Sequence, residues 1–422
     1  MIAARPDLST STRATRDSIK MISPASMHIA YISPYQGPQL LARRRVVNLS
    51  LACNMKTEVV SELLRRQGHS MEIVSPGQAE RQLKLTFYRG FAESTPAGDG
   101  SPVFYPSCVP VRFVTGWWSA LRTLALFKAR HRVRPFDLVV IYNLKLSQIL
   151  CARHARHLGL PVVLDYEDDE FVDVDGRAMN GLRLRGHHQR ARLTLESVDA
   201  SFAVSPHLLA QVPAEVPKLL LRGVVGDDCL DSALDTTGER QNWVAFSGTH
   251  YRTKGLKQLI TAWKAFEIPG WELHIAGHGE LTSTLHEMAR GVRTVVFHGM
   301  LDRRENARFL AQCKIGMNPH DLSQTPGNVF ATKIVDYLAA GTHVISTRMG
   351  QLEPEIEAGI TYIEDNAPNT ILKSLREVIT QGAYRRLARA AAVDLYGPHA
   401  VSKKLETLLQ QAVSRVEKAR LN

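Results

Sequence analysis

Short runs of apolar residues alternate with longer stretches of helical periodicity along most of the chain. The runs are rich in β-branched and aromatic residues, as in MHIAYISPY near the N-terminus, and the stretches between them repeat apolar positions about every 3.6 residues. In the first half this pattern predicts strands at residues 28–33, 71–76, 137–142, 160–166 and 198–206. Strands that alternate with helices form β-α-β units, so we expect a parallel sheet with helices on both faces.

The second half repeats the alternation and predicts a second parallel sheet. Strands are expected at residues 243–248, 271–277, 294–299, 315–319 and 343–347. Helices are expected between them, at residues 254–266, 281–289 and 303–312. The stretch from Asn328 to Thr347 predicts a loop, a helix of about three turns that Asn328 caps and Gly341 ends, and a buried strand.

The length of 422 residues is too great for one ordinary hydrophobic core and indicates two domains. Residues 79–110 are expected to form a long surface loop, and the polar segment 226–242 a linker. The first residues are rich in Ser, Thr and Arg without an apolar core. The expected organisation is a disordered extension at 1–26, a first domain at 27–236, a second domain at 237–396 and a C-terminal helix at 397–422.

The composition is that of a globular protein, with 44% hydrophobic and 22% charged residues. No apolar run reaches the roughly 18 residues of a membrane-spanning helix. The five cysteines are scattered without a Cys-x-x-Cys pair, which argues against a disulfide framework and a structural zinc site and favours the cytoplasm. The net charge of +11 favours an anionic partner, which the charge alone does not identify as nucleic acid, lipid or phosphorylated substrate.

The segment 112–136 combines six Lys or Arg residues and no acid with aromatic side chains that include Trp117 and Trp118. This pattern is typical of a basic amphipathic helix on anionic lipid, which would give the protein a peripheral contact with the inner face of a membrane. It is also typical of a helix that packs its aromatic stripe on the sheet. The two interpretations are compatible if only the basic edge is exposed.

The candidate catalytic and binding residues lie where the predicted strands end. Gly248 ends one strand, and Lys254 opens the following helix, so a short loop could present a lysine, backbone amides and Arg252 to a diphosphate. Glu167 and Asp168 begin an acidic cluster, 167–170, at the end of a strand of the first domain. A solvated cluster and a metal site are both compatible with these carboxylates, but no nearby His or Cys spacing defines a metal cage.

Several motifs together resemble the family 4 retaining glycosyltransferases. In the second half these are SGTHYRTKG, LHIAGHG, VVFHGML, IGMNP and NVFATKIVDYLAAGTHVIS, in the order and at about the spacing of the donor-binding domain of that family. In the first half they are MHIAYISPY, LLRRQGH, PVVLDYEDD, DASFAVSP and RGV. The resemblance covers most of residues 27–415 and implies the GT-B fold, in which two Rossmann-like, doubly wound parallel-sheet domains face each other across a cleft and the final helix crosses back to the first.

The resemblance also assigns roles residue by residue. Asp336 matches an acidic residue that binds the donor ribose, whereas Asn328 stands where the family has a glutamate. The arginine and lysine of the diphosphate loop fall on Thr249 and Lys254, and Glu167-Asp168 stands in place of a His-Asp pair. The expected donor-binding residues are Gly248, Thr249, Gly277, Gly299, Met300, Asn328, Val329, Phe330, Lys333 and Asp336.

The implied function is transfer of a hexosyl or related group, with retention, from a nucleoside diphosphate sugar to a hydroxyl of a glycan, glycolipid or small molecule in polysaccharide or glycolipid synthesis. Lys254 and Arg252 would stabilise the leaving phosphate, with Glu167 and Asp168 as further catalytic candidates and neither a metal nor a cofactor. The departures at Asn328, Thr249 and Glu167 leave open a catalytically impaired protein that binds nucleotide sugars or acts as a scaffold.

Two other classes of protein fit the sequence less well. A nucleic-acid-binding protein rests on net charge alone, because no interleaved aromatic and basic recognition pattern is present. An NAD-dependent dehydrogenase is disfavoured because the first strand and loop lack GxGxxG.

Overall fold

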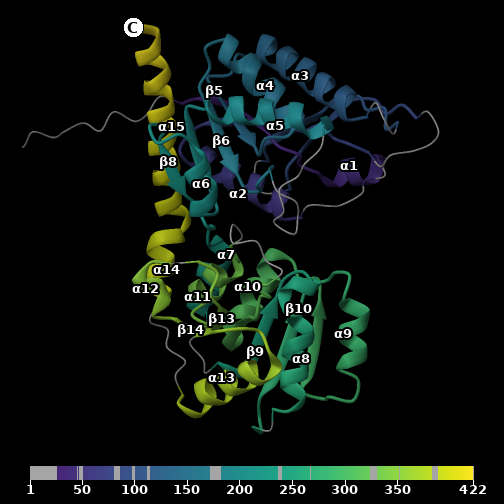
Figure 1. Ribbon diagram of the computed structural model, residues 1–422, viewed down its shortest axis with the longest axis vertical. Coiled ribbons are helices and arrows are strands. Elements are labelled where there is room, and N and C mark those ends of the chain that lie inside the picture. Colours follow the sequence, from purple (N-terminus) through teal and green to yellow (C-terminus); the bar gives the residue numbers. More distant parts are fainter. Residues whose placement is uncertain are drawn as a thin grey trace, which may run out of the picture.

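The protein is built from two parallel sheets, each covered by helices on both faces, and the two halves are stacked along the long axis of the molecule (Figure 1). The computed structural model describes residues 26–44, 46, 51–79, 86–96, 100–111, 115–171, 182–235, 240–266, 268–323, 330–350, 352–382 and 388–421.

The first sheet contains eight strands among the described residues, in the order β3-β4-β2-β1-β5-β6-β7-β8. Their bounds are β1 His28–Ile32, β2 Ser70–Val74, β3 Phe91–Ser94, β4 Pro102–Tyr105, β5 Leu138–Tyr142, β6 Val162–Tyr166, β7 Ala200–Ala203 and β8 Lys218–Leu220. Neighbouring strands pair in parallel except for β3 and β4, which are antiparallel. The central strands are buried on both faces, which explains their continuous apolar sequences.

Two hydrophobic layers enclose this sheet. One layer joins it to α2 (Leu51–Arg66) and α15 (Pro398–Leu421). The other joins it to α3 (Thr115–Val133), α4 (Leu146–His157), α5 (Leu182–Leu195) and α6 (Pro206–Gln211). The short α1 (Pro38–Arg43) follows β1. The helix expected at 112–136 is therefore α3, and its buried Phe127 packs on the sheet.

The second sheet contains six strands among the described residues, all parallel, in the order β11-β10-β9-β12-β13-β14. Their bounds are β9 Gln241–Ser247, β10 Glu272–Ala276, β11 Val295–Gly299, β12 Cys313–Asn318, β13 His343–Thr347 and β14 Ile360–Ile363. One face packs on α8 (Leu256–Lys264), α9 (Thr282–Met288) and α13 (Pro368–Thr380). The other packs on α7 (Asp227–Asp235), α10 (Arg303–Gln312), α11 (Lys333–Ala339), α12 (Pro354–Glu357) and α14 (Arg389–Tyr396).

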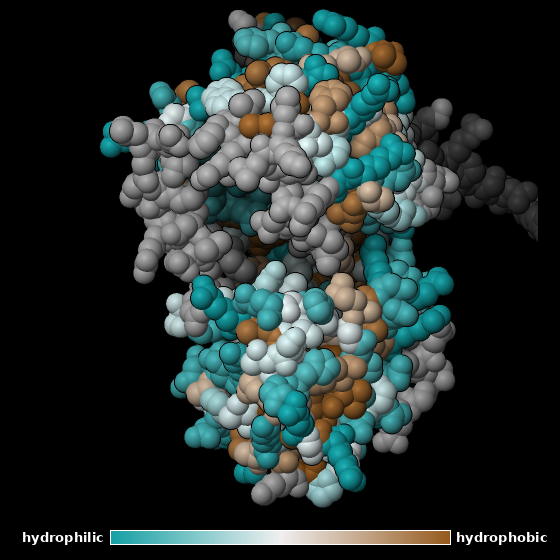
Figure 2. Space-filling view, turned by 90° about the vertical axis from the view of Figure 1, so that its right-hand side faces the viewer, coloured by the Kyte–Doolittle hydropathy of each residue, from teal (hydrophilic) through white to brown (hydrophobic). Residues whose placement is uncertain are grey.

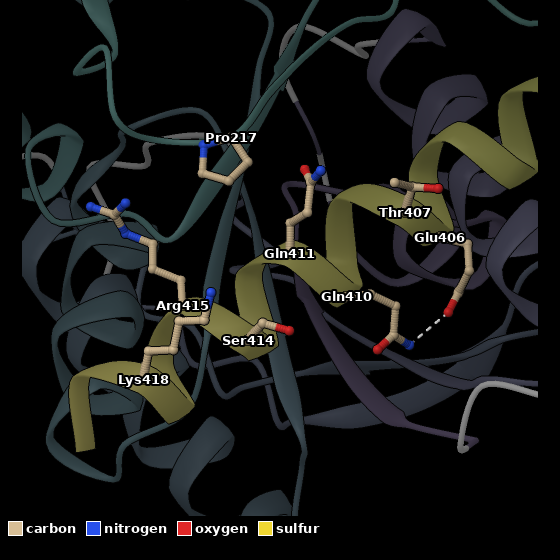
Figure 3. A pocket seen from close by; sticks show the side chains of 8 residues that line it. All are labelled: Pro217, Glu406, Thr407, Gln410, Gln411, Ser414, Arg415 and Lys418. Atoms are coloured by element: carbon tan, nitrogen blue, oxygen red, sulfur yellow. Dashed lines mark hydrogen bonds between the residues drawn. The ribbon is translucent and has the colours of Figure 1, made fainter. Parts of the chain in front are cut away.

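The last helix, α15, leaves the second half and lies along the first (Figure 1). The backbone amide of Met27 donates to Nδ1 of His69, so the Nε2–H of this buried imidazole donates to Glu406 on α15, 2.5 Å away. Near its end, Arg420 donates to the carbonyl oxygen of Gly159 at 2.6 Å. A hollow of about 660 Å³ lies between α15 and Pro217, and Arg415 is among the residues that line it (Figure 3).

The structure corrects three expectations. The segment 79–110 contains β3 and β4 rather than only a surface loop. Most of the expected linker 226–242 is α7, an amphipathic helix that packs against α10. Helix α11 begins at Lys333 with Thr332 in the N-cap position and is shorter than predicted, and Asn328, the expected cap, lies outside the described residues. The expected extension, apart from Ser26, lies outside the described residues.

Candidate functional site

The carboxyl ends of the parallel strands of the second sheet lie along one edge, where three loops are joined by backbone hydrogen bonds. The amide of Gly248, after β9, donates to Ala276 at 3.1 Å, and the amide of Gly277, after β10, donates to Gly299 at 2.7 Å. Such an edge is where ligands bind in open α/β sheets. The strand-end residues predicted from the sequence are thus brought together.

Two glycines at this edge allow very close backbone contacts. At Gly277, with φ 122°, a Cβ atom would lie 1.9 Å from the carbonyl oxygen of Gly248. At Gly255, with φ 70°, it would lie 1.8 Å from the carbonyl oxygen of Pro319. Any side chain would therefore force the loops apart.

Lys333 places a buried amino group at this edge. Its Nζ atom lies 3.7 Å from the centroid of the Phe246 ring and 2.8 Å from where a Cβ of Gly248 would be. It is buried and makes no hydrogen bond within the described part of the chain. Burial lowers the pKa of Lys333 well below its ordinary value, the charge of Lys254 lowers it further, and the Asp336 carboxylate opposes the change.

Lys254 is the second cation of the cluster. It ends a 3-10 turn, η1 (Arg252–Lys254), and its Nζ donates to Nε2 of His320 at 3.1 Å. Burial lowers the pKa of Lys254. Burial and the two lysine charges lower the pKa of His320 to about 2, so this imidazole is neutral at physiological pH. A neutral ring can accept the hydrogen bond from the ammonium and orient it.

Asp336 lies one helical turn after Lys333, on α11. Burial raises the pKa of its carboxyl group to about 6, while Arg303 and Lys333 oppose the rise. The carboxyl group is therefore mostly ionised at neutral pH. It can accept hydrogen bonds from two neighbouring hydroxyl groups, as the ribose assignment requires.

The remaining predicted donor residues are less enclosed. Thr249 and Met300 are exposed, and the ring of Phe330 lies 5.7 Å below the guanidinium group of Arg222. Arg252 is exposed, and its backbone amide donates to Glu280 at 3.4 Å. The predicted residues Asn328 and Val329 lie outside the described residues.

Glu167 and Asp168 belong to the first half of the molecule, after β6. Lys56, on α2, forms an ion pair with Glu167 and contacts the buried Asp165 at 3.1 Å. Asn143, with φ 58°, donates to the Asp168 carboxylate at 2.9 Å and accepts from the backbone amides of both acids. Since Glu167 already has a cationic partner, it is better suited to orient a hydroxyl group than to remove a proton.

The two halves meet near the start of α11, where a Cβ atom added at Gly223 would lie 3.8 Å from Thr332, the residue before Lys333. Arg222, just after β8, donates to Glu353 of the second half at 3.1 Å, and the Tyr396 hydroxyl donates to the same carboxylate at 2.7 Å. The surface is hollowed between the halves (Figure 2). Substrates bound at the strand ends of both halves would therefore approach one another in this hollow.

The sequence did not identify His320, Arg303 or Lys56 as site residues. His320 directly follows the strand sequence IGMNP, so its position at a strand end was an available signal. Arg303 interacts with Asp336, and Lys56 interacts with Glu167. These partners are distant in the sequence, so no local pattern predicts them. No group of three or more His, Cys, Asp or Glu side chains within the described ranges could hold a metal ion.

Sequence comparison identifies two glycosyltransferase regions. Residues 54–218 match the family described as glycosyl transferase 4-like domain, and residues 241–381 match glycosyl transferases group 1. A curated GDP-mannose-dependent alpha-(1-6)-phosphatidylinositol dimannoside mannosyltransferase of Mycobacterium tuberculosis is 30% identical over 145 residues, which are 34% of this chain. The matched segment spans only 36% of that relative.

Solved structures share the fold over nearly the whole length. Sucrose-phosphate synthase from Thermosynechococcus elongatus superposes with a TM-score of 0.63 at 16% identity, covering 92% of this chain and 99% of its own. The Anabaena protein HepE in complex with UDP gives a TM-score of 0.59 at 13% identity, covering 91% and 100%. With the two sheets described above, these neighbours establish the GT-B fold and confirm the predicted fold class.

Proposed function

Because the chain belongs to the group 1 glycosyltransferases, we propose that it transfers a sugar from a nucleoside diphosphate sugar to a hydroxyl acceptor. The observation that carries this proposal is the buried ammonium group of Lys333, which has no hydrogen-bond partner among the described residues and lies beside Gly248. An unpaired buried cation is costly. A diphosphate bound by the strand-end loops would compensate its charge and that of Lys254.

The same cations suit the chemistry of transfer. As the bond between the sugar and the diphosphate breaks, negative charge grows on the leaving phosphate and positive charge on the sugar ring. Lys254, oriented by His320, and Lys333 stabilise the leaving group without a metal ion. In a retaining transfer the acceptor hydroxyl attacks from the face that the phosphate leaves, and a phosphate oxygen takes its proton. Arg252 is left with a minor role because it is exposed.

Asp336 supplies the ribose contact in this proposal, with its carboxylate ionised at neutral pH. The mannosyltransferase is named as GDP-mannose-dependent and HepE is in complex with UDP, which supports a nucleoside diphosphate donor. The acceptor is a glycan or a glycolipid bound by the first half, where Glu167 and Asp168 orient its hydroxyl group. The mannosyltransferase, whose name specifies a phosphatidylinositol glycolipid, supports a role in glycolipid synthesis.

The test is release of nucleoside diphosphate from a panel of UDP, GDP and ADP sugars, with and without glycan and glycolipid acceptors. Lys254→Met and Lys333→Met remove a charge and keep most of the side-chain volume. Each should lower turnover at least about tenfold while the protein stays folded, because each removes a charge that stabilises the leaving group.

Lys257→Met is the matched control, because Lys257 is exposed on α8 only three residues after Lys254. It should retain full turnover. Wild-type rates in both cluster variants would contradict the proposed mechanism. Binding of nucleotide sugars without release, under every pairing of donor and acceptor, would instead support a scaffold protein.

A further inference from the structure

Three helices that cover one face of the first sheet carry positive charge and no negative charge. Lys and Arg residues number four in α3, two in α4 and four in α5, and none of the three helices contains Asp or Glu. The helices pack on the same layer of the core and lie together on the first half of the molecule (Figure 1). We refer to them as the basic face.

Part of this charge is neutralised by other elements. Arg130 donates to both oxygens of Glu72 on β2, and Arg156 lies 3.8 Å from Asp199. Five arginines of these helices are exposed and form no ion pair with other described residues: Arg122, Arg132, Arg153, Arg185 and Arg192. The basic face therefore retains a clear excess of positive charge.

Large apolar side chains are also exposed on the basic face. Trp117, Trp118 and Leu121 share the outer side of the first turns of α3 and are 52%, 36% and 53% exposed. Leu193, on α5, is 58% exposed. The guanidinium group of Arg190 lies 5.4 Å from the centre of the Trp117 ring. Exposed tryptophans are costly in water and are favourable at the headgroup level of a bilayer, where both an apolar and a polar environment are present.

We propose that the basic face docks on an anionic lipid bilayer, with Trp117, Trp118 and Leu121 inserted at the headgroup level and the arginines paired with lipid phosphates. Both components are needed for reversible binding at a bilayer surface, since apolar burial and electrostatic attraction add. Nucleic acid would explain the charge but not the exposed leucines. No described helix is long and apolar enough to cross a bilayer, so the contact is peripheral.

The orientation of the basic face suits a lipid-linked acceptor. Helices α3 and α5 lead into β5 and β7, so their first turns lie at the carboxyl edge of the first sheet, the edge that also carries Glu167. Inserted tryptophans would bring this edge close to the bilayer. The docking itself requires no catalysis, whereas this consequence for the acceptor rests on the proposed function.

The experiment is co-sedimentation of the full chain with vesicles of phosphatidylcholine alone and with vesicles that also contain phosphatidylglycerol. We expect binding only to the anionic vesicles, weakened by salt, with a blue shift of tryptophan fluorescence. The variant Trp117→Ser/Trp118→Ser should lose the blue shift and at least about tenfold in binding, because it removes the inserted apolar groups. Arg122→Glu/Arg132→Glu should lose at least about tenfold by charge reversal.

Leu421→Ser and Lys373→Glu are the controls, because both residues are highly exposed outside the basic face. They should bind vesicles like the unchanged protein. No binding, or equal binding to both kinds of vesicle, would overturn the proposal. Tighter binding to duplex DNA than to anionic vesicles, unaffected by the tryptophan changes, would overturn it in favour of nucleic acid. None of these outcomes depends on nucleoside diphosphate release, so the docking and the transfer reaction can fail separately.

Discussion

At the scale of residues, the second half of the molecule concentrates positive charge where little water can reach it. Burial lowers the pKa values of Lys333 and Lys254, the charge of Lys254 lowers that of Lys333 further, and the neutral His320 accepts a hydrogen bond from Lys254. Such an arrangement costs stability in the free protein and favours an anionic ligand. Binding of an anionic ligand should therefore change the protonation of these lysines, and this change can be measured.

Binding of a nucleoside diphosphate should take up protons. Burial and Lys254 lower the pKa of Lys333, and a bound anion would raise it again, so affinity should fall as pH rises from neutral into the alkaline range. Calorimetric titration with a nucleoside diphosphate, in buffers of different ionisation enthalpy, measures this uptake. It should disappear in Lys333→Met and persist in Lys257→Met; equal uptake in both variants would exclude Lys333 as its source.

Asp336 should destabilise the free protein at neutral pH. Its pKa is raised from 3.8 to about 6, so the folded state binds this proton more tightly than the unfolded state, and stability from this group is lost as pH rises from about 4 to about 6. Asp336→Asn should therefore increase the free energy of unfolding at pH 7 by up to about 3 kcal/mol, with no difference below pH about 3.8.

Urea unfolding of the Asp336→Asn protein at both pH values measures this effect. Asp231→Asn, an exposed change on α7, should be neutral at both. A variant that is less stable than the unchanged protein at pH 7 would contradict the argument.

At the scale of elements, the sequence predicted the features that depend on local pattern. Buried parallel strands such as HIAYI have continuous apolar sequences, and the helices between them have clear periodicity, so their order follows from the chain alone. The strand β3 was missed because its residues are mostly exposed or half-buried at a sheet edge. Helix α7 was missed because its many acidic residues resemble a linker, whereas its apolar side packs on the second half.

The loop between β9 and α8 depends on glycine at position 255. Gly255→Ala would place a Cβ atom 1.8 Å from the Pro319 carbonyl oxygen at a φ of 70°. We expect a loss of at least about 2 kcal/mol of stability, from both strain and displacement of the loop, together with weaker donor binding because Lys254 is the preceding residue. Thermal unfolding and nucleotide titration measure the two effects.

Gly291→Ala is the matched control for this change. Gly291 has a similar φ of 81°, but nothing lies within 4 Å of the added Cβ atom. It should show only the conformational cost, about 1 kcal/mol, and unchanged nucleotide binding. If both variants lose the same stability, close packing at Gly255 is not the cause.

At the scale of the whole molecule, α15 fastens the chain end from the second half onto the first. The sequence predicted an amphipathic helix here. It did not predict the contacts of that helix, because His69 and Glu406 are 337 positions apart. The same limit applies to the ion pair between Lys56 and Glu167, which are 111 positions apart. Pairings of this kind arise only when the complete fold brings the elements together.

Glu406 should stabilise the attachment of α15. Burial raises the pKa of this carboxyl group, but the hydrogen bonds from His69 and Gln410 outweigh it and lower the pKa, so its contribution is present above the ordinary value of 4.5 and is lost as pH falls through the lowered pKa. Glu406→Leu should cost about 1–3 kcal/mol at pH 7 because it leaves the buried His69 N–H unpaired. Chemical unfolding measures the cost. Glu417→Gln, an exposed change on the same helix, should be neutral, and a neutral Glu406→Leu would refute the role.

The central claim is that the lysine cluster holds the diphosphate of the sugar donor. A crystal structure of the protein with a bound nucleoside diphosphate tests it most directly. Phosphate oxygens should lie within hydrogen-bonding distance of Nζ of Lys254 and Nζ of Lys333, and the ribose hydroxyls should contact the carboxylate of Asp336. A nucleotide bound at the strand ends of the first sheet, with the lysine cluster unoccupied, would contradict the claim.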